Sequence, residues 1–307
     1  MKKVAIVIVN WNGKKDTLEC LASVGKLECE GIQRDVIVVD NGSRDISVSA
    51  IREKFPNTIL IENDKNLGFA GGNNAGILYA LKEKADAVWL LNNDTIVHKN
   101  ALKTLARGLE VNDAGIVGSK IYFYKGREFH SHRYKESERG NVLWYAGGVI
   151  DWHNMYASHR GVDEVDHGQY EKTSETDFAT GCSMMVGSEV FTRIGIFDER
   201  YYLYLEDVDL CLRAHRAGFG IIYTPGSIVW HKNAGSSGGA GSALHDYYLM
   251  RNRFLLGFRY APMRTKVALL RQAPVLIFGN NRQHRRAALD ALTGRWGNQY
   301  EPEQNNN

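Results

Sequence analysis

The chain has 307 residues, of which 44% are hydrophobic, 24% charged and 10% aromatic, so it is long enough and apolar enough for a large folded domain. Its 38 lysines and arginines stand against 35 aspartates and glutamates, and the resulting formal charge of +3 excludes a surface that is basic throughout, as a general nucleic-acid binder needs. The 4 cysteines form no CxxC pair, which is typical of reduced thiols in a cytoplasmic protein.

The amino-terminal apolar run covers only residues 4–9 and follows Met1-Lys2-Lys3, so it predicts a β-strand rather than a signal peptide. No stretch reaches the roughly 18 to 20 consecutive apolar residues of a membrane span. Any contact with a membrane is therefore expected to be peripheral.

Apolar runs alternate with helical patterns through the first hundred residues. Strands are expected at 4–9, 36–39, 58–61 and 87–91, and helices at 14–24, 44–55 and 72–83. Val, Ile and Leu runs without polar alternation indicate strands buried on both faces, and the helices between them indicate right-handed parallel crossovers. The prediction is an α/β fold with a doubly wound, mostly parallel nucleotide-binding sheet, in which ligands bind beyond the carboxyl ends of the strands.

The rest of the chain is less regular. A helix at 99–110 and a strand at 114–119 precede a stretch at 125–170 that is expected to form mobile loops over the site, apart from a strand near 142–150. Regular structure is expected again at 176–186, with helices from 188 and at 206–217 and a strand at 220–223. Residues 235–241 predict a flexible loop. Helices at 245–260, 264–278 and 282–292 and a disordered tail at 298–307 complete the prediction.

Polar residues follow every predicted strand of the first half, at 10–13, 40–43, 63–66 and 92–94. The Asp40 carboxylate can accept the imide N–H of a uracil or thymine ring, and Trp11 offers a face on which the base can stack. The alternative is that Asp40 forms an Asx-turn through Asn41-Gly42 while Trp11 covers the sheet edge.

Residues 66–76 (NLGFAGGNNAG) are glycine-rich and open a helix. Backbone without side chains can approach a sugar or diphosphate closely, and the amides of a helix N-terminus favour anions. The segment is not a GxGxxG motif and no Walker lysine follows it, so it identifies no ligand by itself.

The motifs VNWNG, VVDNGSRD around Asp40, NLGFAGGNNAG and LNNDT around Asp94 come in an order and spacing that resemble the family 2 inverting glycosyltransferases of the GT-A fold, particularly their rhamnosyltransferase-like branch. The resemblance covers about residues 3–260. It implies transfer of a sugar, rhamnose from dTDP-rhamnose or a sugar from a UDP-sugar, to a hydroxyl of a cell-surface glycan or a polyprenyl-linked acceptor. No nucleic-acid recognition module is visible in the sequence, so no nucleic-acid partner is expected.

The resemblance also divides the chain. Residues 1–240 form the GT-A domain, with a nucleotide-sugar half at 1–120 and an acceptor half at 121–240, and residues 241–297 form a basic helical segment. The donor-binding residues that it implies are Asn10, Trp11, Asp40, Asn66, Gly68, Asn74, Asn92 and Asn93. Asn73 stands where relatives often carry arginine, which weakens the case for a diphosphate contact there.

A divalent cation is expected because a diphosphate leaving group gains negative charge as the C–O bond breaks, and Mn²⁺ or Mg²⁺ neutralises it. Asn92-Asn93-Asp94 matches the family's DxD-like metal motif with asparagine in the first place, and Asp94 is a hard carboxylate ligand. The resemblance adds His231, in VWHKN, as a second ligand. The alternatives are a turn aspartate and a structural histidine.

An inverting transfer is a single displacement in which a carboxylate takes the proton of the attacking hydroxyl. The resemblance assigns this base to Asp207 in the EDVD segment. The alternatives are that first-turn carboxylates complement the helix dipole and that Asp209 pairs with Arg213. The acceptor-side residues that the resemblance implies are Gly181, Asp198 and Glu206.

Between Arg251 and Arg295 ten basic residues stand against Asp290 alone and are interleaved with apolar side chains. Basic amphipathic segments adsorb to anionic membranes, which predicts a peripheral place on the inner face of the cell membrane. The alternative is a helical pair that closes the domain or forms a homodimer.

Two other functions agree less well with the sequence than sugar transfer does. A nucleotidyltransferase lacks support because no Lys- and Arg-bearing glycine signature follows the first strand. A non-catalytic sugar-nucleotide-binding subunit has no need of Asp94, Asp207 and His231 together.

Overall fold

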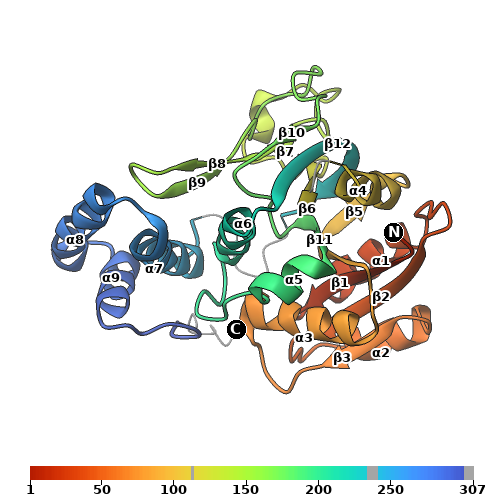
Figure 1. Ribbon diagram of the computed structural model, residues 1–307, viewed down its shortest axis with the longest axis horizontal. Helices are drawn as coiled ribbons and strands as arrows, with labels where there is room; N and C mark the ends of the chain where they lie inside the picture. The colour runs from red at the N-terminus through yellow and green to blue at the C-terminus, as the bar shows by residue number, and fades with distance from the viewer. Residues whose placement is uncertain (112–113, 234–240, 301–307) are drawn as a thin grey trace.

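The computed structural model describes residues 1–111, 114–233 and 241–300 (Figure 1). Its first half alternates strands and helices as the sequence predicts. The elements are β1 (Lys3–Asn10), α1 (Lys14–Val24), β2 (Gln33–Asp40), α2 (Ser47–Lys54), β3 (Ile59–Glu62), α3 (Gly68–Lys82) and β4 (Ala87–Asn92).

Strands β1 to β4 are parallel and lie in the order β3-β2-β1-β4. The order reverses at β1, so right-handed crossovers place α1 and α2 on one face of the sheet and α3 on the other. β1 is covered on both faces, and for this reason Val4 to Ile8 are all apolar and at most 1% exposed. The reversal also opens a crevice between the carboxyl ends of β1 and β4, where doubly wound sheets bind ligands.

The second half extends the same sheet on the side of β4. Strand β11 is antiparallel to both β4 and β6, and β12 runs parallel to β6. The full order is β10-β12-β6-β11-β4-β1-β2-β3, with β5 paired to β12 and β7 to β6. The elements are β5 (Thr95–Val97), α4 (Ala101–Leu109), β6 (Ala114–Phe123), the 3-10 turn η1 (Ser131–Arg133), β7 (Leu143–Tyr145), β8 (Gly148–Asp151), β9 (Tyr156–His159), β10 (Ser174–Glu175), β11 (Ser183–Gly187), α5 (Ser188–Ile194), α6 (Glu206–Arg216) and β12 (Gly220–His231).

Three strand expectations for this half need correction, and the first is that the strand expected at 114–119 runs on to Phe123 in β6. The strand expected near 142–150 is split into β7 and β8 because Gly147 has a φ of +115° and breaks the extended backbone. The strand expected at 220–223 runs on to His231, since β12 continues along β6 after a register shift between Thr224 and Ile228. The α/β GT-A fold, with a mostly parallel sheet, is confirmed.

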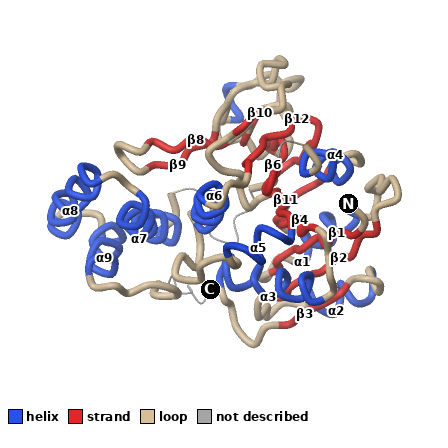
Figure 2. The backbone as a smooth tube through the Cα atoms, viewed as in Figure 1, coloured by secondary structure: helices blue, strands red, loops and turns tan. Residues whose placement is uncertain are grey.

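Three carboxyl-terminal helices form a group at one end of the molecule, with α6 between them and the sheet (Figures 1 and 2). They are α7 (Ala243–Tyr260), α8 (Met263–Phe278) and α9 (Arg282–Leu292). No helix in the described part of the chain is long and apolar enough to cross a membrane.

The end of the described chain packs against α7. The Tyr300 ring stacks on Tyr247 with centroids 4.9 Å apart, and the Tyr248 hydroxyl donates to the Tyr300 carbonyl at 3.0 Å. The disordered tail predicted at 298–307 therefore does not begin at Asn298, because these aromatic contacts hold the first three of its residues. Residues 301–307, and 235–240 of the predicted flexible loop, lie outside the described ranges.

Candidate active site

A chain of side-chain hydrogen bonds crosses the crevice between β4 and β2. The Asn93 amide donates to the Thr17 hydroxyl at 2.9 Å, Thr17 donates to Asn10 Oδ1 at 2.7 Å, and Asn10 Nδ2 donates to Asp40 Oδ1 at 2.7 Å. A Cβ on Gly13 would meet the Asn93 amide nitrogen at 2.5 Å, so only glycine fits beside this chain. The structure thus joins three predicted donor residues through Thr17, which carries no sequence signal.

Asp40 is buried and its second oxygen accepts the backbone N–H of Ser43 at 2.9 Å. This hydrogen bond closes the turn through Asn41-Gly42, which is the alternative to base recognition. It fixes the carboxylate at the carboxyl end of β2. Trp11 follows β1 directly and is half-buried. Base recognition by these two residues stays a prediction.

The glycine-rich loop is shaped by two asparagines. Asn66 Oδ1 accepts the backbone N–H of Gly68 at 2.8 Å and the Asn41 amide at 3.0 Å. Gly68 has a φ of +72°, and a Cβ there would lie 2.4 Å from the Tyr202 carbonyl oxygen. The loop that opens α3 therefore touches the segment that precedes α6.

Asn74 lies one turn and a half further along α3 and is buried. Its amide donates to the Phe197 carbonyl at 3.1 Å and to Glu199 at 3.0 Å, and its oxygen accepts the Phe197 N–H at 3.0 Å. In this structure Asn74 joins α3 to the 197–199 segment. Its predicted contact with the donor is not tested by this geometry.

Asp94 and His231 meet because β5 and β12 pair antiparallel with Thr95 opposite His231. Asp94 Oδ1 lies 3.1 Å from His231 Nε2, and both side chains are largely buried. Burial disfavours the charged imidazolium, yet Asp94 and Cys182 together outweigh burial and raise the pKa of His231 well above its usual value.

The spacing of these two atoms fits a shared cation. Octahedral Mg²⁺ holds its ligands at about 2.0–2.1 Å, which places neighbouring ligand atoms about 2.9 Å apart. One carboxylate oxygen and one imidazole nitrogen also suit Mn²⁺. Among the residues that the structure describes, no group of three His, Cys, Asp or Glu side chains could hold a metal ion. Asp94 and His231 are therefore the candidate protein ligands in the described structure.

Asp207 stands in the first turn of α6, facing the turn that precedes β11. Its Oδ2 accepts the backbone N–H of Gly181 at 2.8 Å, and its Oδ1 accepts that of Val208 at 2.8 Å. Burial is the main influence on this carboxyl and raises its pKa despite these hydrogen bonds. A raised pKa makes the carboxylate a better proton acceptor.

The turn at 180–182 brings the Asp94–His231 pair and Asp207 together. The Cys182 carbonyl accepts the N–H of Asn92 at 2.9 Å, so this turn is fixed to the end of β4. Burial raises the pKa of the Cys182 thiol. His231 lowers this pKa, whereas Asp94 and Asp207 raise it, so all three groups act on the same thiol. A Cβ on Gly181 would meet the Phe69 ring at 2.9 Å and Asp207 Cβ at 3.6 Å, so donor loop, turn and base are in direct contact.

Glu206 precedes the base and is 4% exposed. Its Oε2 has no hydrogen-bond partner in the described structure. Burial, followed by the neighbouring Asp207, raises its pKa well above the usual value. A buried carboxyl with an unpaired oxygen lowers the stability of the fold. Groups with such strongly shifted pKa values are typical of functional sites.

The backbone before α6 is held in an unusual conformation. Tyr202, Tyr204 and Leu205 all have left-handed φ values, of 62°, 69° and 68°. Such residues cost on the order of 1–3 kcal/mol each and persist only where the surroundings enforce them.

The enforcing contacts come from α7. The buried Asn252 donates to the carbonyls of Tyr201, Leu203 and Tyr204 at 2.9, 2.8 and 2.8 Å. The buried Arg251 donates to the carbonyl of Tyr201 at 2.9 Å and to that of Gly297 at 2.6 Å. These two residues position the segment that carries the base, a role that the sequence did not reveal because the partners are backbone carbonyls about 50 residues away.

Asp198 faces arginines. Its carboxylate lies 2.6 Å from Arg200 and 3.1 Å from Arg259. Asp209 is fully buried and pairs with Arg213 at 2.7 Å, as the structural alternative states, and with Arg259 at 2.9 Å. Asp209 therefore fastens α7 to α6, and Asp198 fastens α7 to the segment before α6. An acceptor contact by Asp198 stays a prediction.

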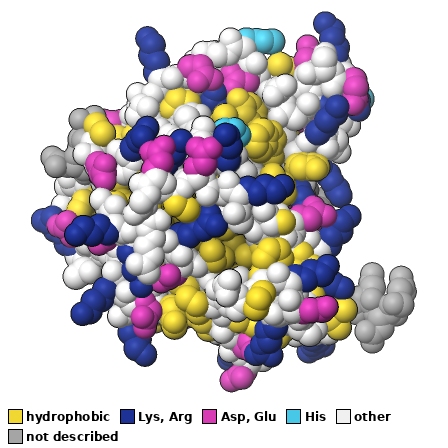
Figure 3. All heavy atoms as spheres, turned by 90° about the vertical axis from the view of Figure 1, so that its right-hand side faces the viewer, with side chains coloured by type: hydrophobic (Ala, Val, Ile, Leu, Met, Phe, Trp, Pro, Cys, Tyr) yellow, Lys and Arg dark blue, Asp and Glu magenta, His cyan; other side chains and the backbone are white. Residues whose placement is uncertain are grey.

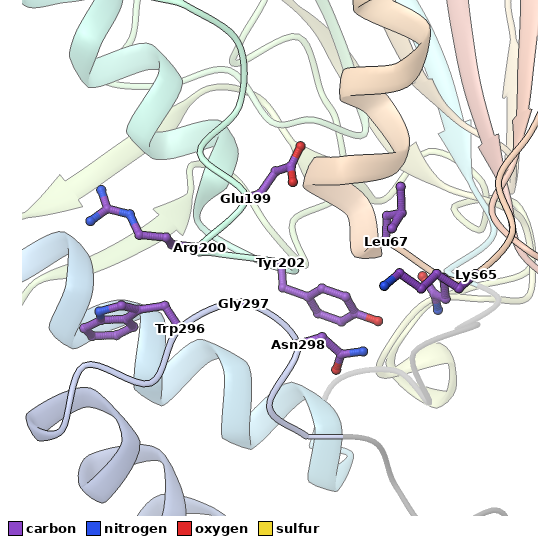
Figure 4. Close-up of a pocket in the computed structure, with 9 residues that line it drawn as sticks. Lys65, Leu67, Glu199, Arg200, Tyr202, Trp296, Gly297 and Asn298 are labelled. Atoms are coloured by element: carbon purple, nitrogen blue, oxygen red, sulfur yellow. The ribbon is translucent and has the colours of Figure 1, made fainter.

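A cavity of about 400 Å³ lies beside this arrangement, between the glycine-rich loop and the carboxyl-terminal segment (Figure 4). Its wall combines charged groups with the rings of Tyr202 and Trp296. The lining residues are Lys65, Asn66, Leu67, Glu199, Arg200, Tyr202, Trp296, Gly297 and Asn298.

A doubly wound sheet with polar side chains beyond the carboxyl ends of its strands defines a nucleotide-binding α/β fold. The sequence profile described as Glycosyl transferase family 2 matches residues 5–193, and the chain therefore belongs to that family. It is a glycosyltransferase with a sugar-nucleotide donor, as predicted.

Relatives and solved structures agree with this assignment. The chain is 25% identical to the low-salt glycan biosynthesis hexosyltransferase Agl10 of Haloferax volcanii, over 82% of this chain and 74% of that one. It is 26% identical to the N-acetylglucosaminyl-diphospho-decaprenol L-rhamnosyltransferase of Mycobacterium tuberculosis, over 85% and 89%. The crystal structure of GalNAc-T7 with UDP, GalNAc and Mn²⁺ shares the fold, with a TM-score of 0.66, 15% identity and coverage of 95% of this chain and 55% of that chain.

Proposed function

We propose that the protein transfers a sugar, with inversion and with the help of Mn²⁺ or Mg²⁺, from a thymidine or uridine diphosphate donor to a hydroxyl of a glycan or polyprenyl-linked acceptor. Rhamnose is the favoured sugar, because the relatives include the mycobacterial rhamnosyltransferase and a dTDP-rhamnosyl transferase of Shigella flexneri, which is 25% identical over 81% of this chain. The decaprenol in the mycobacterial enzyme's name supports the lipid-linked acceptor.

The observation that carries the proposal is the meeting of Asp94, His231 and Asp207 around the turn at 180–182. The cation, when bound, neutralises the charge that develops on the diphosphate. Asp94 and His231 hold it on the donor side. Asp207, across the turn, removes the proton of the acceptor hydroxyl as that oxygen attacks the anomeric carbon.

The remaining residues orient the donor. Asp40, at the end of β2, is fixed for a base imide by Asn10 and Ser43. The loop at 66–68 presents backbone close to the crevice, with Asn66 also lining the cavity. Because these groups are already hydrogen-bonded to one another, they lose little freedom when the donor binds.

Calorimetry with dTDP, UDP and their sugars, with and without Mn²⁺, tests the proposal. We expect Mn²⁺ to strengthen binding to the wild-type protein. The variant Asp94→Ala should lose this gain and His231→Ala should reduce it, whereas Asp16→Ala, an acidic residue of α1 paired with Lys232, serves as the control. Equal Mn²⁺-dependent affinity in wild type, Asp94→Ala and His231→Ala would remove the metal assignment.

A transfer assay separates the enzyme from a binding subunit. Release of nucleoside diphosphate that depends on a polyprenyl-diphosphate-sugar acceptor supports the proposal. Tight donor binding without transfer to any such acceptor would instead favour the non-catalytic subunit.

A further inference from the structure

Helix α8 is apolar on two sides, but the rest of the protein covers only one of them. Leu269 and Ala273 are buried, and Leu269 packs against Gly257 of α7. The other side carries an exposed apolar strip, which we call the α8 strip. It consists of Met263, Val267, Leu270, Val275 and Phe278, with exposures of 73%, 40%, 51%, 71% and 85%.

The residues of the α8 strip follow one another at steps of four, three, five and three, so at about 100° per residue they occupy one broad face of the helix, roughly 140° wide. Pro274 and Ala268 are also exposed on this side, and its only polar members are Arg264 and Arg271. A continuous exposed apolar surface of this kind marks a site of contact with a partner or a membrane. Figure 1 shows α8 at the outer edge of the carboxyl-terminal helices, away from the sheet.

The charges around the α8 strip are of one sign. Three of the ten basic residues between Arg251 and Arg295 make contacts within the protein, because Arg251 and Arg253 are buried and Arg259 forms an ion pair with Asp209. The basic residues left on α8, α9 and the turn that follows are Arg264, Lys266, Arg271, Arg282, Arg285, Arg286 and Arg295.

No exposed acid on α8, on α9 or in the turn that follows balances these basic groups. Asp290 is the only acidic residue from 261 to 297, and it is 6% exposed. It accepts a hydrogen bond from the Tyr247 hydroxyl at 2.6 Å and lies 3.8 Å from Arg286. Its charge is therefore used inside the helical group.

The opposite end of the molecule differs. Figure 3 shows acidic and basic side chains interspersed on that face. Lys103, for example, lies 2.8 Å from both Glu28 and Glu30. The combination of an exposed apolar strip with unbalanced positive charge is thus a property of α8 and α9.

We infer that α8 and α9 bind the surface of an anionic phospholipid bilayer, with the α8 strip inserted between the headgroups. Apolar side chains supply the insertion, and the surrounding arginines are attracted to anionic lipid. α8 has 16 residues, so it is about 24 Å long and lies in the plane of the membrane. Pro274 lacks an N–H, which leaves the Leu270 carbonyl without its helical partner, and this polar group limits insertion to the hydrated interface.

A bilayer explains this surface better than a second copy of the chain. In a twofold dimer the same patch faces itself, so the arginines of one α8 would meet those of the other. No exposed acid on α8 or α9 can pair with them. Juxtaposed like charges oppose association, whereas anionic lipid headgroups neutralise the arginines.

Vesicle co-sedimentation tests the inference without any sugar donor or acceptor, so its outcome is independent of the proposed transfer. The full chain is mixed with phosphatidylcholine vesicles, with and without phosphatidylglycerol, over a range of salt concentrations. We expect stronger binding to the anionic vesicles and release as salt rises. The triple variant Leu270→Ser, Val275→Ser, Phe278→Ser should bind at least about tenfold more weakly, and Arg264→Gln with Arg271→Gln should lose about fivefold per charge on anionic vesicles only.

A matched control uses exposed apolar residues elsewhere. Ile46, Leu78 and Val111 have exposures of 64%, 56% and 54%, and their triple serine variant should bind like the wild type. Unchanged circular dichroism and melting temperature establish that all variants are folded. The inference fails if neutral and anionic vesicles recover equal amounts, or if the α8 variant binds like the wild type. A wild-type dimer that the α8 variant dissociates, without vesicle binding, would assign the strip to a second copy instead.

Discussion

The two sides of the candidate site are stabilised in different ways. On the donor side, Asn93, Thr17, Asn10 and Asp40 form an unbroken chain of hydrogen bonds. On the acceptor side, Glu206 has an unpaired buried oxygen and three residues before it are left-handed. The donor side is thus locally satisfied, whereas the acceptor side keeps its geometry only because α7 holds it. Each of the following predictions tests that difference.

The largest effect is expected from Asp207→Asn. Removal of a general base costs about 10² to 10⁴ in rate. Donor affinity should stay near the wild-type value, since the donor side does not depend on this carboxylate. Steady-state transfer with the lipid-linked acceptor, together with donor calorimetry, measures both quantities.

A pH profile provides an independent check on the base. The carboxylate must be unprotonated to accept a proton, and burial raises its pKa above the ordinary value of 3.8. Activity should therefore decline, as pH falls, at a higher pH than an ordinary aspartate gives. Transfer by Asp207→Asn at the wild-type rate contradicts the assignment, and a collapsed melting temperature would favour the helix-dipole alternative.

The second effect concerns the support from α7. Asn252→Leu removes the Asn252 donor from the carbonyls of Leu203 and Tyr204, whereas the Tyr201 carbonyl keeps its bond from Arg251, and each unpaired buried group costs about 1–3 kcal/mol. We expect a lower free energy of unfolding and, because the base is displaced, a fall in kcat of about 10². The Kd of the donor should change little.

Arg253→Met is the matched control for that variant. Arg253 is the next buried residue of α7, but it donates to the Asn154 carbonyl at 2.9 Å rather than to the segment before α6. It should lose stability without a comparable loss of kcat. Equal losses of kcat in both variants would mean that α7 acts only through general stability.

A smaller effect is expected at Gly68, where the glycine-rich loop touches the segment before α6. Gly68→Ala places a Cβ 2.4 Å from the Tyr202 carbonyl oxygen at a φ of +72°. Gly126→Ala has a similar φ of +81° with open space around it, so it measures the backbone cost alone. We expect Gly68→Ala to lose about 1–3 kcal/mol more than Gly126→Ala in denaturant unfolding. Both donor Kd and kcat should worsen, and an unchanged kcat would show that the two sides are not coupled at Gly68.

The smallest effect, of opposite sign, is expected from Glu206→Gln. The folded-state pKa of Glu206 is raised, so the wild type loses stability as pH rises from the unfolded value of 4.5 through the folded value. The variant should be more stable than the wild type by about 0.5–2 kcal/mol at neutral pH. The difference should shrink as pH is lowered towards 4.5, and thermal unfolding over that range measures it. A variant less stable than the wild type at neutral pH would contradict the burial argument.

Much of the fold follows from local sequence patterns. The helix predicted at 14–24 is α1 with the same bounds, and the helix predicted at 264–278 differs from α8 by one residue. The antiparallel insertion of β11 between β4 and β6 did not follow, because strand order depends on pairing between distant segments rather than on hydrophobic periodicity.

The candidate site was predicted unevenly for the same reason. Asp94, His231 and Asp207 were found because they stand in motifs, and the structure brings them around one turn. Thr17 was not found as a site residue and the role of Asn252 was not predicted, because the importance of both lies in hydrogen bonds to groups that are remote in sequence. Residue type and spacing do not encode such partners.

The contacts of Arg251 bear on how this enzyme can be recombined with its relatives. The guanidinium joins residues 200–201, before the base, to Gly297, in the wall of the cavity. A chimera spliced within α7 separates these partners, whereas one that exchanges 198–300 as a unit keeps them together. We therefore expect acceptor preference to be inherited as a block that spans α6 to the end of the described chain, and swapping the carboxyl-terminal helices alone should yield proteins that bind donor but do not transfer it.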